Sequence, residues 1–138
     1  MTVFSNFSKS YPLLLLGNGK MGSSLLAGWI KAGLDPTSVL IVDPFNGHED
    51  IKSYKSILNL PKNLSVKILV LAVKPQILPS VIKECADIGL KAQSILSIAA
   101  GFKVSKLEEI FGTDVPILRA MPNTPVSIGK GISGIFGN

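Results

Sequence analysis

Three glycines, Gly17, Gly19 and Gly22, follow a short apolar run at 13–16 in the pattern G-x-G-x-x-G. Between a strand and a helix, glycines with this spacing let the backbone turn tightly and approach a diphosphate closely. The N–H groups at the positive end of the following helix would then face the negative charge. The stretch therefore predicts phosphate binding, although a glycine-rich turn without a ligand can have the same spacing.

An acidic residue, Asp43, stands about 20 residues after Gly22, at the end of the second apolar run. A carboxylate at that place can accept hydrogen bonds from the adenosine ribose of a dinucleotide. The same negative charge repels a 2′-phosphate, so Asp43 favours NAD over NADP. The nearest basic residues that could offset this charge are His48, Lys52 and Lys55.

Three further loops leave the ends of apolar runs, the edge where open α/β sheets bind ligands. AVKPQ (72–76) carries Lys74, SIAAG (97–101) consists of small residues, and two prolines bracket Asn123 in MPNTPVSIGKG (121–131). We expect these loops to meet the glycine loop at one crevice. A solvated lysine, tight helix packing and an ordinary turn would explain the three loops almost as well.

The positions of these loops follow from alternating strand and helix patterns. Strands are expected at 13–16, 39–42, 66–73, 94–99 and 115–121, with a further one beginning in 131–136; helices are expected at 23–32, 77–88 and 103–111, and 47–58 is expected to be weakly helical. Continuous apolar strands separated by helices indicate a parallel sheet covered on both faces. We predict a single α/β domain with a Rossmann-like, doubly wound, mostly parallel sheet over residues 11–138, after an N-terminal tail of residues 1–10.

The bulk composition limits the class of protein. With 138 residues, 46% of them hydrophobic, the chain can form one globular domain with its own core. Its apolar runs fall far short of the roughly 20 residues of a membrane span, and its first residues lack the pattern of a secretory signal. The single cysteine, Cys85, excludes an intrachain disulfide and fits a reducing compartment. We therefore expect a cytoplasmic protein that does not bind membranes.

Charge pattern and missing residue types narrow the function further. The net charge of +5 comes from dispersed lysines rather than an arginine-rich cluster, so nucleic-acid binding is not expected, and a small anionic ligand suits this charge. One histidine and one cysteine do not provide a metal site or a Ser-His-Asp triad. A bound cofactor would carry any redox chemistry, and we assign no catalytic side chain and no metal ligand within this chain.

Four segments together resemble a known family: GNGKMG (17–22), LAVKPQ (71–76), SIAAG (97–101) and RAMPNTPVSIGKG (119–131). With them the chain resembles the N-terminal half of pyrroline-5-carboxylate reductases over about residues 11–138. The resemblance implies NAD(P)H-dependent reduction of 1-pyrroline-5-carboxylate to proline, the last step of proline biosynthesis, and NADPH is the usual cofactor of the family.

The resemblance also implies what the rest of the enzyme would supply. Family members carry a C-terminal helical domain, absent from this chain, through which they form homo-oligomers and make most substrate contacts. We therefore expect this chain to be the cofactor-binding domain, to bind a dinucleotide weakly and to be inactive in isolation. Two alternatives stay open: another imine or β-hydroxyacid reductase, and a non-catalytic nucleotide-binding module.

The resemblance implies a cofactor site that runs from the pyrophosphate through the adenosine ribose to the nicotinamide. Its expected residues are Gly17, Asn18, Gly19, Lys20, Met21, Gly22, Asp43, Asn59, Ala72, Val73, Lys74, Pro75, Ile98, Ala99 and Ala100. Asn123 is expected on the substrate side.

Overall fold

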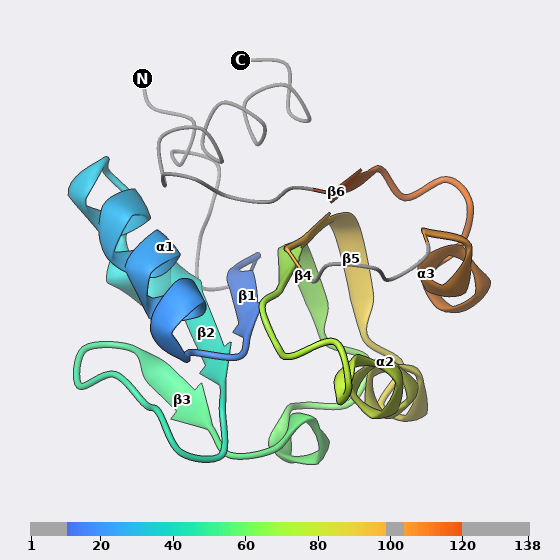
Figure 1. The fold of residues 1–138 in the computed structure, drawn as a ribbon, viewed down its shortest axis with the longest axis horizontal. Coiled ribbons are helices and arrows are strands. Elements are labelled where there is room, and N and C mark those ends of the chain that lie inside the picture. Colours follow the sequence, from blue (N-terminus) through green and yellow to red (C-terminus); the bar gives the residue numbers. More distant parts are fainter. Residues whose placement is uncertain (1–10, 99–103, 120–138) are drawn as a thin grey trace.

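The computed structural model of the protein describes residues 11–98 and 104–119. Its centre is a six-stranded parallel sheet with the strand order β3-β2-β1-β4-β5-β6 (Figure 1). The strands are β1 (Leu13–Leu16), β2 (Val39–Val42), β3 (Lys52–Tyr54), β4 (Ser65–Leu71), β5 (Lys91–Ser97) and β6 (Ile117–Arg119). The helices are α1 (Lys20–Lys31), α2 (Leu78–Asp87) and α3 (Val104–Phe111), and two short 3₁₀ turns are η2 (Pro36–Ser38) and η3 (Ile57–Asn59). This is the doubly wound strand order of Rossmann-type folds, so the predicted fold class is confirmed.

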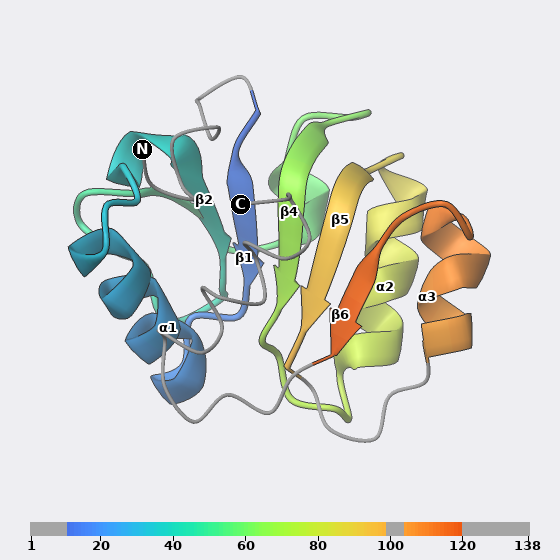
Figure 2. The ribbon, with the colours of Figure 1, turned by 90° about the horizontal axis from the view of Figure 1, so that it is seen from above.

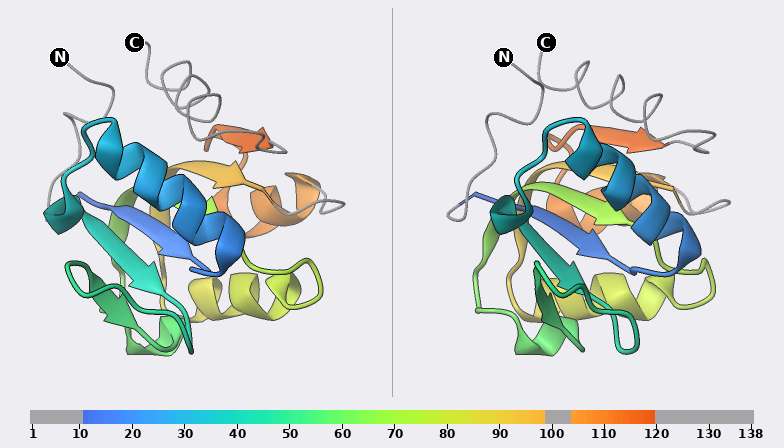
Figure 3. Two further views of the ribbon diagram at one scale, coloured as in Figure 1. Left: turned by 60° about the vertical axis from the view of Figure 1, so that its left-hand side comes forward. Right: turned by 90° about the vertical axis from the view of Figure 1, so that its left-hand side faces the viewer.

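Helices cover both faces of the sheet, α1 one face and α2 with α3 the other (Figures 2 and 3). Because successive strand residues point to opposite faces, the four leucines of β1 divide between two cores. Leu13 and Leu15 pack in the cluster that contains Trp29 of α1, whereas Leu14 and Leu16 pack in the cluster that contains Cys85 of α2. An uninterrupted apolar strand is the expected result of burial on both faces.

Cys85 of α2 is fully buried in the core on the side of the sheet that α2 covers. Burial, with a smaller contribution from the neighbouring Glu84 carboxylate, raises the pKa of the thiol to about 12. The thiol therefore stays protonated at neutral pH, and it acts as a small apolar side chain rather than a nucleophile.

The segment 47–58, predicted to be weakly helical, is different in the structure. It contains the edge strand β3 and the beginning of the turn η3. Strand β3 pairs with β2 in parallel, with Leu40 opposite Lys52 and Val42 opposite Tyr54. Backbone pairing on one side of an exposed edge places little demand on side-chain type, so β3 carries no apolar pattern that the sequence could reveal.

The other elements agree with their predicted positions, with shifts at their ends. β1 and β2 have the predicted bounds, β4 and β5 begin earlier than predicted, and α1 begins at Lys20 rather than Ser23. The strand expected at 131–136 lies outside the described residues. In the part of the chain that the structure describes, no helix has the length and apolar character needed to cross a bilayer.

The order of the strands creates a crevice that suits a ligand. β1 pairs with β2 on one side and with β4 on the other. The chain leaves β1 toward α1 on one face and leaves β4 toward α2 on the opposite face (Figure 2). The two connections diverge at the carboxyl edge of the sheet, which creates the crevice where open α/β sheets bind ligands.

Candidate functional site

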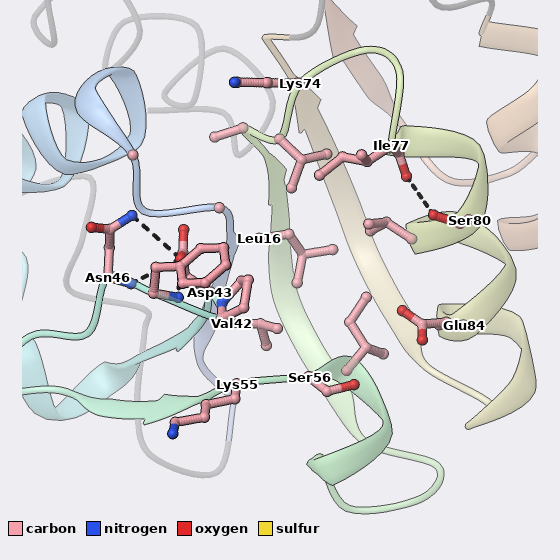
Figure 4. A pocket seen from close by; sticks show the side chains of 18 residues that line it. Leu16, Val42, Asp43, Asn46, Lys55, Ser56, Lys74, Ile77, Ser80 and Glu84 are labelled. Carbon is pink, nitrogen blue, oxygen red and sulfur yellow. Dashed lines mark hydrogen bonds between the residues drawn. The ribbon is translucent and has the colours of Figure 1, made fainter.

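A cavity of about 510 Å³ opens at this carboxyl edge, between the loops that follow β1, β2 and β4 and the first turns of α2 (Figure 4). Its walls come from segments that are far apart in the sequence. The lining residues are Leu16, Gly17, Gly19, Val42, Asp43, Pro44, Phe45, Asn46, Lys55, Ser56, Ile57, Ala72, Val73, Lys74, Ile77, Ser80, Val81 and Glu84.

Two glycines of the loop between β1 and α1 are required by close packing. Gly17 has a φ of +94°, and a Cβ there would lie 2.9 Å from the carbonyl carbon and oxygen of Ala72. At Gly22 a Cβ would collide with the carbonyl oxygen of Gly17. These residues let the loop fold against α1 and against the end of β4, so both are explained without a ligand.

Gly19 is different, because a Cβ there would meet nothing within 4 Å. It lines the cavity and is the N-cap residue of α1. In the described residues no side chain caps this helix, and its first turn contains no acidic residue. A helix N-terminus of this kind offers backbone N–H groups and partial positive charge to an anion. The open backbone at Gly19 therefore fits the diphosphate of a dinucleotide.

Asp43 connects the glycine loop to the loop after β2 (Figure 4). Its Oδ2 atom accepts a hydrogen bond from the backbone N–H of Asn18 at 2.7 Å. Its Oδ1 atom accepts from the backbone N–H groups of Phe45 at 2.8 Å and Asn46 at 2.9 Å, and from the Asn46 side chain at 3.4 Å. The carboxylate thus fixes the positions of two loops that are 25 residues apart in the sequence.

These hydrogen bonds decide the charge of Asp43. Partial burial by itself would raise the pKa of the carboxyl group, but the N–H donors of Phe45, Asn18 and Asn46 together outweigh burial and hold the pKa below its ordinary value of 3.8. Asp43 is therefore ionised at neutral pH. Among the described residues, one N–H group donates to its Oδ2 atom, which can therefore still accept a hydrogen bond from a ligand hydroxyl.

Asn18 links the same two loops a second time. Its buried side chain donates from Nδ2 to the carbonyl oxygens of Asn46 at 3.2 Å and Gly47 at 3.4 Å. Its Oδ1 atom is also buried and has no donor within the described part of the chain. The loop after β2 is consequently held to the glycine loop through both the backbone and the side chain of Asn18.

The opposite wall of the cavity comes from η3, the end of β4 and α2. Val73, Ile77 and Val81 make this wall largely apolar. Around them, Figure 4 shows Lys55 and Ser56 on one side and Ser80 and Glu84 of α2 on the other. Of the three basic residues considered near Asp43, Lys55 lines the cavity, whereas His48 and Lys52 do not.

The structure brings part of the predicted cofactor site together. Gly17, Gly19, Asp43, Ala72, Val73 and Lys74 line one cavity, and Asn18 and Gly22 support its glycine loop. Lys20, Met21, Asn59, Pro75 and Ile98 are described but do not line the cavity. Ala99, Ala100 and Asn123 lie outside the described residues.

Sequence reasoning missed two groups of cavity residues. Phe45 and Asn46 follow Asp43 in a polar stretch of the sequence. The one sign in the sequence that this stretch contributes to the cavity was an aromatic residue among polar ones. Ser56 and Ile57 were missed because their segment was predicted to be weakly helical, although the neighbouring Lys55 was considered as a basic residue near Asp43. Ile77 and Val81, within the helix predicted at 77–88, also contribute to the cavity wall, and Ile77 is half-exposed.

Fold and site together define a dinucleotide-binding domain of the Rossmann type. Comparison with known sequences agrees: the family described as "NADP oxidoreductase coenzyme F420-dependent" matches residues 13–101. This match covers more than half of the chain, and the chain belongs to that family.

Curated relatives give a narrower resemblance. The chain is 32% identical to a pyrroline-5-carboxylate reductase of Glycine max over 96% of its length, and 27% identical to that of Haemophilus influenzae over 90%. These alignments cover 50% and 47% of the two relatives. The predicted resemblance to one half of these reductases is confirmed, and the chain spans about half the length of the curated relatives it matches.

Solved structures agree in fold. A Plasmodium falciparum pyrroline carboxylate reductase with NADP bound matches 88% of this chain and 45% of its own chain, with a TM-score of 0.66 at 28% identity. A pyrroline-5-carboxylate reductase from Coxiella burnetii matches 86% of this chain and 46% of its own, with a TM-score of 0.62 at 25% identity.

A pair of glycine substitutions separates the packing role from the binding role of the loop. Gly22→Ala places a methyl group against backbone, so we expect a loss of about 2 kcal/mol or more in the free energy of unfolding. Gly19→Ala enters open space with an extended backbone, so stability should change by less than about 1 kcal/mol. Dinucleotide affinity of the Gly19→Ala variant should nevertheless fall at least about tenfold, because the methyl group occupies the approach to the helix N-terminus.

Chemical denaturation and calorimetric titration of both variants measure these effects. Wild-type affinity in a folded Gly19→Ala variant would contradict the assignment of the diphosphate to this loop.

The titration of Asp43 should report its hydrogen bonds. Because folding lowers the pKa, ionised Asp43 stabilises the folded state above pH 3.8, and this contribution is lost as the pH falls through the lower folded-state pKa. We expect the carboxyl ¹³C signal of Asp43 and the amide signal of Asn18 to titrate together in an NMR experiment, with a midpoint below 3.8. A midpoint at or above that value would contradict the hydrogen bonds through which Asp43 joins the glycine loop to the loop after β2.

Proposed function

We propose that this chain is the cofactor-binding part of an NAD(P)H-dependent reductase that converts 1-pyrroline-5-carboxylate to proline. The observation that carries the proposal is the open backbone at Gly19, which joins an uncapped helix N-terminus to a cavity that extends to Asp43. The similarity to pyrroline-5-carboxylate reductases over about 90% of the chain supports the choice of substrate. In this reaction the bound nicotinamide supplies the hydride that reduces the C=N bond.

Each segment of the site has a proposed part in holding the dinucleotide. The segment from Gly17 to Gly22 holds the diphosphate, and Lys20 and Met21 belong to the first turn of α1 within this segment. Asp43 accepts one hydrogen bond from the adenosine ribose through Oδ2. Residues 72–75 and 98–100 line the part of the site that holds the nicotinamide and its ribose. Asn59 lies on the adenosine side of the cofactor, and Asn123 lies on the substrate side.

Asp43 also supports a preference for NADH over NADPH. Its carboxylate is ionised at neutral pH, and a 2′-phosphate on the adenosine ribose would bring two further negative charges close to it. Lys55 lines the same cavity and offsets part of this repulsion. We propose that the carboxylate dominates, because hydrogen bonds fix it at the end of β2, whereas the lysine is exposed on a flexible side chain.

The remaining parts of the activity belong to the second half of the relatives, which this chain does not span. We propose that the helical half supplies most substrate contacts and the homo-oligomer interface, and that the protein acts in the cytoplasm. The 138-residue chain by itself should then bind a dinucleotide and turn over very little 1-pyrroline-5-carboxylate.

Calorimetric titration with NADH and NADPH tests the cofactor assignment. We expect the chain to bind NADH about tenfold more tightly than NADPH, because of the charge repulsion at Asp43. Asp43→Asn removes the charge but keeps an oxygen that can accept from the N–H groups of Phe45 and Asn46. The preference of this variant should fall to near unity.

Three outcomes have different meanings in this experiment. A folded chain that binds neither nucleotide would contradict the proposed function. Tighter binding of NADPH by the wild type would contradict the role given to Asp43 but not the cofactor site. Turnover of 1-pyrroline-5-carboxylate by this chain at the rate of a full-length relative would contradict the division of labour between the two halves.

A further inference from the structure

Phe45 is a large aromatic residue that the fold leaves in solvent. Its side chain is 91% exposed, the highest value among the exposed large hydrophobic residues that the structure describes. It takes part in neither hydrophobic core, yet it lines the cavity shared by Gly17 and Gly19. Isolated exposed apolar residues are common on protein surfaces, so this exposure needs further support before it indicates a ligand contact.

That support comes from the backbone on both sides of Phe45. Its N–H donates to Asp43 Oδ1 at 2.8 Å, and the next N–H, from Asn46, donates to the same atom at 2.9 Å. The carbonyl oxygen of Asn46 in turn accepts from the buried Asn18 side chain. Residues 43–46 thus form a turn that hydrogen bonds hold to the glycine loop. The ring of Phe45 therefore projects from a backbone whose position is fixed.

The rest of the cavity shows which part of a dinucleotide would reach this ring. Among the described residues, those that line it come from the ends of β1 and β2, from η3 and α2, and from the loops that follow β1, β2, β3 and β4, and none comes from β5 or β6. The cavity therefore includes the loop after β2, where Asp43 meets the adenosine ribose in the proposed function. A flat ring beside that ribose would have Phe45 on one side and the apolar residues Val73, Ile77 and Val81 across the cavity.

We propose that Phe45 stacks on the adenine base of the dinucleotide and so makes the loop after β2 a base-binding element as well as a ribose-binding one. This inference rests on the proposed dinucleotide site. An aromatic face stacks on a base without reading its edge, and the base in turn covers apolar surface that is otherwise in water. Asp43 is then a positioning residue for the stack, because its carboxylate fixes the backbone that carries the ring.

The test uses fragments of the cofactor with the full 138-residue chain. Phe45→Ala should weaken the binding of ADP-ribose and of NADH by about tenfold, while leaving the binding of nicotinamide mononucleotide unchanged. Phe45→Tyr should keep at least half of the wild-type affinity, because it preserves the aromatic face. Since the side chain is exposed, thermal unfolding of these variants should match that of the wild type.

Leu58 provides the matched control. It is also an exposed large hydrophobic residue, 56% accessible, but it does not line the cavity. Leu58→Ala should therefore bind all three probes like the wild type. If Leu58→Ala lowers the affinity for ADP-ribose as much as Phe45→Ala does, the effect comes from a general loss of apolar surface and the proposal is overturned.

A spectroscopic readout separates stacking from indirect effects. The Phe45→Trp variant places an indole at the cavity, and its fluorescence should be quenched by ADP-ribose but not by nicotinamide mononucleotide. The wild type, whose single Trp29 is buried in the core, gives the background signal. Unchanged fluorescence at saturating ADP-ribose would overturn the stack.

The binding outcomes distinguish this inference from the proposed function. If the wild type binds ADP-ribose and Phe45→Ala binds it equally well, the stack is wrong and the dinucleotide site stands. If the folded wild type binds neither ADP-ribose nor either dinucleotide, both are wrong.

Discussion

The site depends on the hydrogen bonds that converge on the Asp43 carboxylate. One oxygen accepts from the backbone of the glycine loop, and the other accepts from two successive N–H groups of the loop after β2. Without this acceptor, the N–H groups at the ends of β1 and β2 would lose their partners at the same edge of the sheet. An ionised carboxylate therefore holds the glycine loop, which is the proposed phosphate-binding loop, and the same charge faces the ribose end of the proposed cofactor.

The sheet makes this arrangement possible, because it brings distant segments to one edge. β1 lies between β2 and β4, so the residues that follow these three strands become neighbours although they span more than 50 positions of the sequence. Close packing then fixes the details: Gly17 lies against the end of β4, and Gly22 lies against Gly17. The open position at Gly19 stands between two positions that have no space for a side chain. A rigid cradle with one accessible face suits a charged diphosphate.

The sequence predicted the parts of the fold that depend on burial. The leucines of β1 and the apolar residues of β2 gave both strands their correct bounds, because burial on two faces leaves continuous apolar runs. β3 was missed, since its stability comes from backbone pairing with β2 and its side chains are exposed or half-buried. In the site, spacing predicted Gly17, Gly19 and Asp43. It did not predict the contribution of Ser56, whose position depends on β3, or the hydrogen bonds between Asn18 and the loop after β2, which exist only in three dimensions.

The central claim is that a dinucleotide binds at the carboxyl edge of this sheet, and ¹H–¹⁵N NMR spectra recorded during addition of NADH test it most directly. The account predicts shifts of the amide signals from the loops 17–22, 43–47 and 72–74. It also predicts unchanged signals around a second cavity at the opposite edge, lined in part by Pro36, Leu40 and Tyr54. Shifts centred on that opposite edge, with an unperturbed glycine loop, would contradict the account.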